Sequence, residues 1–176
     1  MQWKKRYKNS YGSDVKTMRV FLIILVTVLF SCKSTQTVTP ITSEPQIIPF
    51  VELSAGLNGD FSEKINKIIT NQNEYNAAWT AAFSRFSDQP KPAQIDFKNN
   101  MILLVAMGEK NSGGYSIKID SIVENEKTIV VTILETSPGK SCITTSVMTY
   151  PYQMVELKNS TKEVVFKTIE KSFDCK

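Results

Sequence analysis

The chain has 176 residues, of which 21 are basic and 17 acidic, and it contains no histidine. The lack of histidine excludes Ser-His-Asp and Cys-His catalysis and every histidine-ligated metal site. The sequence also has no Walker loop, no dinucleotide fingerprint and no stripe of interleaved basic and aromatic residues. We therefore predict that the protein is not an enzyme and has no catalytic residues, no metal or other cofactor and no nucleic-acid partner. Pairs of carboxylates such as Asp120 with Glu124, or Glu135 with Asp174, are interpreted as solvated surface groups.

The first element is an eleven-residue apolar run, Val20 to Phe30, which follows Lys16 and Arg19 and ends in Leu29-Phe30-Ser31-Cys32. A helix that spans a bilayer needs about 20 apolar residues, so the run is too short. A basic flank, a short apolar core and a small residue before a cysteine are typical of a lipoprotein export signal. We predict a signal peptide over residues 1–31 and lipidation, for example by palmitate, at Cys32. An ordinary signal peptide and an N-terminal anchor helix remain alternatives.

Such a protein would be held to a membrane by acylated Cys32, on the extracytoplasmic side of the bacterial cell envelope. The sequence does not distinguish Met1 from Met18 as the start of translation. Six of the 21 basic residues and one of the 17 acidic residues precede Cys32. The mature part would therefore have 15 basic and 16 acidic residues, a net charge of −1. The basic character of the whole chain comes from the export segment and indicates no nucleic-acid binding.

Residues 32–49 are rich in Ser, Thr, Pro and Gln and predict a flexible tether. The domain would occupy residues 50–176 and begin with a strand over 50–54. Residues 64–70 predict a short strand or a helical turn. One amphipathic helix follows, capped by Asn73 and ended by Pro90 and Pro92. Its apolar stripe has helical spacing and predicts a buried face, made of Tyr75, Ala78, Trp79, Ala82, Phe83 and Phe86.

The rest of the chain predicts strands over residues 101–107, 115–122, 128–134, 143–148, 153–157 and 164–169. Residues 101–107 are uniformly apolar, as in a strand buried on both faces, whereas 115–122 alternate between apolar and polar residues. Short strands at about ten-residue spacing favour an antiparallel sandwich or an open barrel. We therefore predict a mainly β (α+β) domain, a β-sandwich or open barrel covered by the one helix.

Two cysteines remain after Cys32, namely Cys142 and Cys175. An even number of cysteines in an exported domain favours a disulfide between them. The alternative is a pair of free, buried thiols.

Two segments are candidates for binding a protein partner. The first is the glycine-containing loop Lys110-Asn111-Ser112-Gly113-Gly114-Tyr115, and the second is Tyr150-Pro151-Tyr152. Both connect predicted strands, and such connections gather at the ends of a sandwich, where a rigid sheet presents them. The alternative is that the glycines only satisfy turn geometry while Tyr115 packs inward.

These motifs resemble a known family. Gly108-Glu109, Ser112-Gly113-Gly114-Tyr115, Ser137-Pro138-Gly139 with Cys142, and Tyr150-Pro151-Tyr152 occur in an order that is similar to the C-terminal domain of the PrcB protease-complex subunit family. The resemblance covers about residues 60–170. It implies a membrane-tethered bacterial lipoprotein that acts as a non-catalytic protein-binding module. It also implies a subunit that stabilises or docks an extracytoplasmic protease.

An alternative follows from a second, partial resemblance. Asn111-Ser112-Gly113-Gly114-Tyr115 is similar to the Asn-Pro-Thr-Thr-Gly-Tyr loop of chagasin-type inhibitors, although the proline is absent. Those proteins are β-sandwiches that inhibit cysteine proteases through loops. The same loop would then be an inhibitory one.

Overall fold

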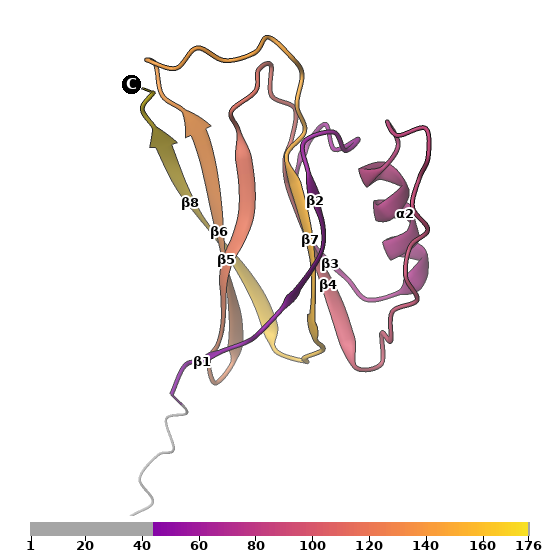
Figure 1. Cartoon of the computed structure of the whole chain (residues 1–176). Helices are drawn as coiled ribbons and strands as arrows, with labels where there is room; N and C mark the ends of the chain where they lie inside the picture. Colours follow the sequence, from indigo (N-terminus) through magenta and orange to yellow (C-terminus); the bar gives the residue numbers. More distant parts are fainter. Residues whose placement is uncertain (1–43, 176) are drawn as a thin grey trace, which may run out of the picture. The chain divides into compact units, whose positions relative to one another are not determined.

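A computed structural model describes residues 44–175 (Figure 1). The predicted signal peptide, the lipidation site Cys32 and most of the predicted tether lie outside these residues. No helix in the part of the chain that the structure describes is long and apolar enough to cross a membrane.

The domain consists of two four-stranded sheets packed face to face, with one helix on the outside (Figure 1). One sheet has the order β1-β5-β6-β8, made of β1 (Gln46–Ile47), β5 (Ser116–Glu124), β6 (Thr128–Pro138) and β8 (Glu163–Phe173). The other has the order β2-β7-β4-β3, made of β2 (Val51–Gly56), β7 (Tyr152–Lys158), β4 (Asn100–Met107) and β3 (Lys64–Ile69). The predicted β-sandwich with a single helix is confirmed.

Helix α2 (Gln72–Ala82) packs on the outer face of the second sheet, which we call the covered sheet. The outer face of the first sheet carries no helix among the described residues, and we call it the bare sheet. The two sheets therefore have different surroundings, although each has four strands.

One pair of strands departs from the predicted antiparallel arrangement. β6 and β8 run parallel, with Thr128 opposite Glu163 and Pro138 opposite Phe173, whereas all other paired strands are antiparallel. The chain leaves β6, descends through β7 in the covered sheet and turns back beside β6 as β8 (Figure 1). Two strands that are joined through a strand of opposite direction in the other sheet must run the same way.

The central position of β4 in the covered sheet explains the uniformly apolar sequence of this strand. Alternate residues of a strand point to opposite faces. Met101, Leu103, Val105 and Met107 therefore face the bare sheet, and Ile102, Leu104 and Ala106 lie under helix α2. Both faces of β4 are buried from Met101 to Met107, so a polar side chain at any of these seven positions would be removed from water.

Helix α2 begins and ends earlier than the sequence predicts. Its N-cap is Asn71 and not Asn73, because the Asn71 side-chain oxygen accepts a hydrogen bond from the Glu74 N–H at 2.9 Å. The helix ends at Ala82, well before Pro90, whose carbonyl oxygen instead accepts a hydrogen bond from the Trp79 indole. The prolines therefore do not terminate the helix.

The apolar stripe of the helix is only partly buried. Tyr75, Ala78 and Ala82 contact the covered sheet, whereas Trp79 and Phe83 are half-buried beside it. Phe86 lies beyond the end of the helix and is exposed, so its predicted place in the core is wrong. Because the helix is shorter than predicted, the Phe86 ring lies past the end of the helix and does not help to cover the sheet.

The predicted strand over residues 143–148 is also wrong. These residues belong to an irregular connection between β6 and β7, Gly139–Thr149, which we call the crossover segment. Its β-branched composition is typical of a strand, but it passes over the end of the sandwich, where it joins neither sheet. Of the ambiguous residues 64–70, all but the last form a strand, β3.

Candidate functional site

The two loops singled out by the sequence meet at one end of the sandwich, which we call the loop end. The loop after β4, Gly108–Tyr115, lies beside the crossover segment (Figure 1). The Lys110 N–H donates to the Thr149 carbonyl at 2.8 Å, and the Thr149 N–H donates to the Lys110 carbonyl at 2.9 Å. The Gly113 N–H donates to the Thr145 carbonyl at 2.9 Å. These hydrogen bonds hold the loop 108–115 against the crossover segment, which leads directly into Tyr150-Pro151-Tyr152.

Glycine is needed at specific points of this end. Gly108 and Gly114 have φ values of 74° and 92°, in the left-handed region that disfavours residues with a side chain. A Cβ on Gly113 would lie 2.6 Å from the Thr145 hydroxyl oxygen, so glycine permits the close approach of the loops. Turn geometry therefore explains these three glycines without any ligand.

The tyrosines of the second candidate segment are not available to a partner. Tyr150, Pro151 and Tyr152 are all buried. The Tyr150 hydroxyl donates to Glu109 at 2.9 Å, and the Arg85 guanidinium lies 4.2 Å from the centre of the Tyr150 ring. Tyr150-Pro151-Tyr152 therefore supports the site from within, and its predicted role as a contact surface is wrong.

Tyr152 shows why this segment is buried. It enters the covered sheet, packs on Phe61 at 5.0 Å between ring centres and makes a 2.9 Å hydrogen bond with Ser54. Burial raises the pKa of Tyr152 above its ordinary value, and the bond to Ser54 partly opposes this shift. The hydroxyl therefore stays protonated and fixes β7 to β2.

The first candidate loop is more open. Asn111 and Gly114 are exposed, while Lys110, Ser112, Gly113 and Tyr115 are half-buried. Tyr115 packs against the core between the sheets, and the Lys110 ammonium lies 5.7 Å from its ring centre. The structure thus presents the Asn111 side chain and the backbone at Gly114, with Tyr115 turned partly inward.

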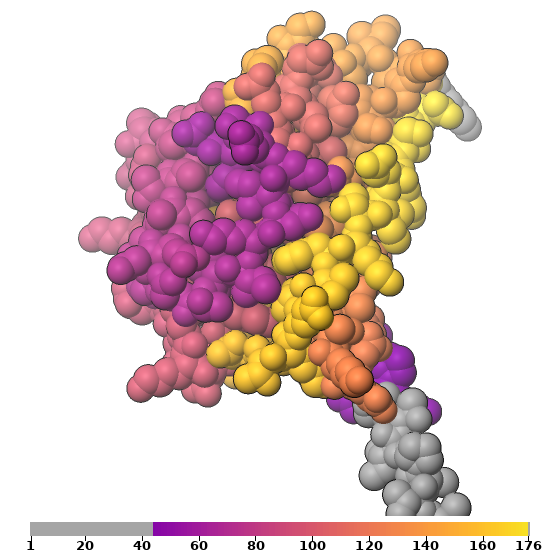
Figure 2. Space-filling view, turned by 180° about the vertical axis from the view of Figure 1, so that it is seen from behind, coloured from indigo at the N-terminus to yellow at the C-terminus, as the bar shows by residue number. Residues whose placement is uncertain are grey.

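The crossover segment contributes residues that the sequence did not identify as a site. Ile143 is fully exposed, and Val147 and Met148 are also exposed. We call these three residues the apolar ridge. In Figure 2 the orange atoms of this segment form the outermost part of the molecule at the top of the view. The sequence did not reveal the ridge, because its apolar residues were predicted to form a strand.

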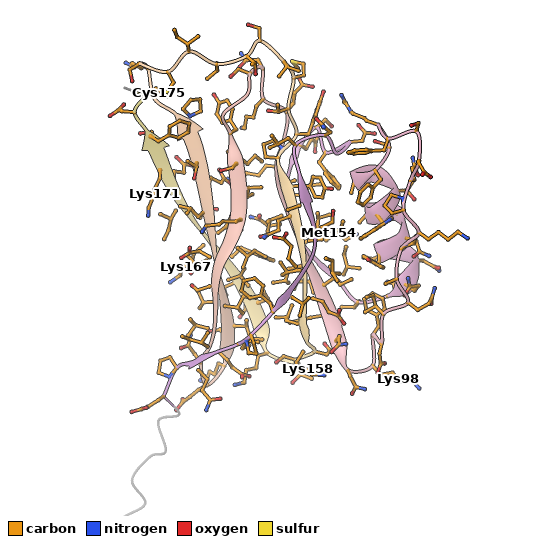
Figure 3. The ribbon with its side chains drawn as sticks, viewed as in Figure 1. Lys98, Met154, Lys158, Lys167, Lys171 and Cys175 are labelled. Atoms are coloured by element: carbon orange, nitrogen blue, oxygen red, sulfur yellow. A yellow bond between two sulfur atoms is a disulfide. The ribbon has the colours of Figure 1, made fainter. Side chains whose placement is uncertain are left out.

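A disulfide fixes the base of this ridge. Cys142 is bonded to Cys175, as predicted, with 4.8 Å between their Cα atoms (Figure 3 labels Cys175). The Gly139 N–H donates to the Phe173 carbonyl at 2.8 Å, and the Cys175 N–H donates to the Ser141 hydroxyl at 3.3 Å. Ile143 therefore follows directly after a residue that is covalently tied to the end of β8.

Beneath the loop end, polar groups link the two sheets. The Gln153 side chain accepts a hydrogen bond from the Ile119 N–H at 2.6 Å. Glu135 is buried and pairs with Lys64 of the covered sheet at 2.6 Å, so its interpretation as a solvated carboxylate is wrong. The position of Glu135 on the inner face of β6 requires this partner, because an unpaired buried charge is costly.

The acidic and cysteine side chains at this end do not form a metal-binding cluster among the described residues. Within residues 44–175, no group of three or more histidines, cysteines or acidic residues could hold a metal ion. Glu109 is bonded to Tyr150, and both cysteines are in the disulfide. What the loop end offers is a shaped surface with an exposed apolar ridge.

A comparison with protein families supports the resemblance stated above. Residues 101–158 match the family model described as PrcB C-terminal. The matched segment runs from β4 to β7 and includes both loops of the loop end. The resemblance to the PrcB C-terminal family is thereby confirmed for these residues. No curated protein and no solved structure matches the chain.

Proposed function

We propose that the chain is a non-catalytic subunit that binds an extracytoplasmic protease, or a protein in the same complex, through the loop end. The family match is consistent with a subunit of a protease complex, and the matched residues 101–158 include both loops of the loop end. The observation that carries the proposal is the apolar ridge, whose three large side chains are exposed on a segment tied down at its base.

The fixed backbone of the ridge favours binding. Three exposed apolar side chains on one short segment are a candidate interaction surface. A loop that is already held by hydrogen bonds and a disulfide loses little conformational entropy on association. The ridge can therefore enter an apolar pocket of a folded partner without first becoming ordered.

Lipidation at Cys32 completes the proposal and comes from the sequence. The described chain enters the sandwich through β1, at the end opposite to the crossover segment (Figure 1). An acyl anchor upstream of β1 would leave the ridge at the end remote from the point of attachment. This arrangement suits a subunit that presents a binding surface to a neighbouring envelope protein.

The test compares two exposed isoleucines at opposite ends of the domain. Ile143→Asp changes the ridge, and Ile47→Asp, at a residue 80% exposed, is the matched control. Each full chain captures partners from solubilised native envelope, and quantitative mass spectrometry measures the recovered protease. Ile143→Asp should reduce recovery about tenfold or more, as for a residue central to an interface, and Ile47→Asp should leave it unchanged.

Both variants must unfold at the same temperature as the parent, because exposed substitutions cost little stability. Equal recovery by Ile143→Asp and the parent chain would overturn the role of the ridge. Inhibition of a cysteine protease by the purified chain, lost on changing Asn111, would instead support the chagasin-type alternative.

Lipidation is tested separately. The Cys32→Ser variant should incorporate no fatty-acid analogue and should leave the membrane fraction, because its acyl attachment point is removed. Undiminished labelling of this variant would show that Cys32 is not the modified residue.

A further inference from the structure

Strand β8 has a free edge along its whole length. It is eleven residues long, stands last in the order of the bare sheet and pairs only with β6. In Figure 2 its yellow atoms run across the surface uncovered by other described segments. Backbone groups on such an edge are a template for another strand.

The inner face of β8 is incompletely covered. The register with β6 places Val164, Phe166, Thr168, Glu170 and Ser172 on the side that faces the covered sheet. Val164 and Phe166 are half-buried at the margin of the core, and the other three are exposed. The sandwich is therefore open along this side, beside two apolar side chains that a further strand would bury.

The outer face of β8 carries unpaired positive charge. Lys167 and Lys171 are exposed, and neither makes an ion pair with another residue of the described segment. Figure 3 shows both side chains pointing away from the covered sheet. They are four residues apart, so an added strand would place its own residues opposite them at the same spacing.

We infer that the edge of β8 binds an extended segment of the protein partner as an additional strand of the bare sheet. The segment has acidic residues at positions i and i+4, facing Lys167 and Lys171, and an apolar residue on the other face beside Phe166. Backbone hydrogen bonds supply affinity in strand addition, and alternate side chains supply selectivity. The inference rests on the proposed function in that the occupant belongs to a protein partner.

The edge and the apolar ridge are neighbouring surfaces. The end of β8 is joined to the crossover segment through the Cys142–Cys175 disulfide and the bond from Gly139 to Phe173. One partner can therefore contact the ridge with a folded part and β8 with an extended part. The two contacts are distinguishable, because they involve different residues.

The experiment maps the register of the added strand. Full chains carry the photo-cross-linker p-benzoylphenylalanine in place of Lys167, Lys171 or Ile143 and are irradiated with solubilised native envelope. Mass spectrometry identifies the partner residue joined to each position. The Lys167 and Lys171 positions should cross-link to a single partner, at residues four apart in a segment with acidic side chains.

A charge-reversal pair sharpens this result. Lys167→Glu combined with Lys171→Glu should lower partner recovery about tenfold, because like charges would face each other across the strands. Lys98→Glu combined with Lys158→Glu reverses two exposed lysines that also make no ion pair within the described residues but lie away from this edge, and should leave recovery unchanged.

The outcomes separate this inference from the proposed function. Cross-links from Ile143 but none from Lys167 and Lys171 would mean that the lysines only protect the edge, and would overturn strand addition alone. Cross-links between β8 strands of two copies would overturn the partner named here. A lack of cross-links at all three positions would overturn the inference together with the proposed function.

Discussion

The central strand of the covered sheet and the last strand of the bare sheet have opposite surroundings. In β4 seven of the eight residues are buried, whereas in β8 none of the eleven is buried. β4 contains no charged residue and β8 contains four, so the composition of each strand already reflects its surroundings. The difference comes from position, because β4 has two neighbouring strands and a helix above it, and β8 has one neighbouring strand.

Because of this difference, the two sheets have different roles in the domain. Helix α2 gives the covered sheet a second apolar layer, so that its central strands β4 and β7 are buried on both faces and supply much of the stable core. The bare sheet has one buried face and is free to present its outer face, its edge and the crossover segment that begins at the end of β6. Substitutions in the two sheets should therefore differ in their effect on stability and binding.

The largest expected effect is at the centre of the covered sheet. Ile102 in β4 is 0% exposed and packs under helix α2. Ile102→Ala removes three carbon atoms from a close-packed site and should lower the free energy of unfolding by about 4 kcal/mol. Denaturation by urea measures this quantity. A loss below about 1 kcal/mol would mean that the helix does not pack tightly on the sheet.

Removal of the disulfide should have the next largest effect. The bond joins residues 33 apart in sequence, and its loss should cost about 3–4 kcal/mol in the loop-entropy model. The measurement is the melting temperature of the parent chain with and without reductant. The Cys142→Ser, Cys175→Ser double variant is the control and should not respond to reductant. A parent chain equally stable in both conditions would contradict the prediction.

Removal of the ion pair between the sheets should lower the free energy of unfolding by less. Lys64→Met leaves the buried Glu135 without its partner and should cost about 1–3 kcal/mol. Lys67→Met on the same strand is the matched control, because Lys67 pairs with Glu74 at the surface, where such pairs contribute less than about 1 kcal/mol. Equal losses in the two variants, measured by urea denaturation, would show that Glu135 does not depend on Lys64.

Local patterns predicted the covered sheet well. The apolar run of β4 identified a strand buried on both faces, and the spacing of Tyr75, Ala78 and Ala82 identified the helix above it. Burial of one face of an element places apolar residues at regular intervals in the sequence.

The helix boundary was less accurate, although the sequence contains a signal for it. Glu74 stands three residues after Asn71, which is the spacing of a capping box, whereas Asn76 stands three residues after Asn73. The hydrogen bond from the Glu74 N–H to Asn71 agrees with that spacing.

The sequence located the loop end but did not predict which of its residues are buried and which are exposed. Its glycines indicated a turn, yet the burial of Tyr150 and Tyr152 depends on Arg85, Phe61 and Ser54, which are distant in sequence. The crossover segment has the composition of a strand, and whether it pairs depends on the sheet edges available to it. The parallel pairing of β6 and β8 likewise follows from the tertiary path of the chain.

The smallest expected effect is on the outer face of the bare sheet. Ile169 in β8 is 45% exposed, so Ile169→Ala should lower the free energy of unfolding by about 0.5 kcal/mol, far less than the same substitution at Ile102. Urea denaturation of the two variants under identical conditions gives the comparison directly. A cost at Ile169 close to that at Ile102 would mean that a layer outside residues 44–175 covers the bare sheet. A small cost would leave the outer face of β8 free of any stabilising role, as expected for a surface that presents groups to a partner.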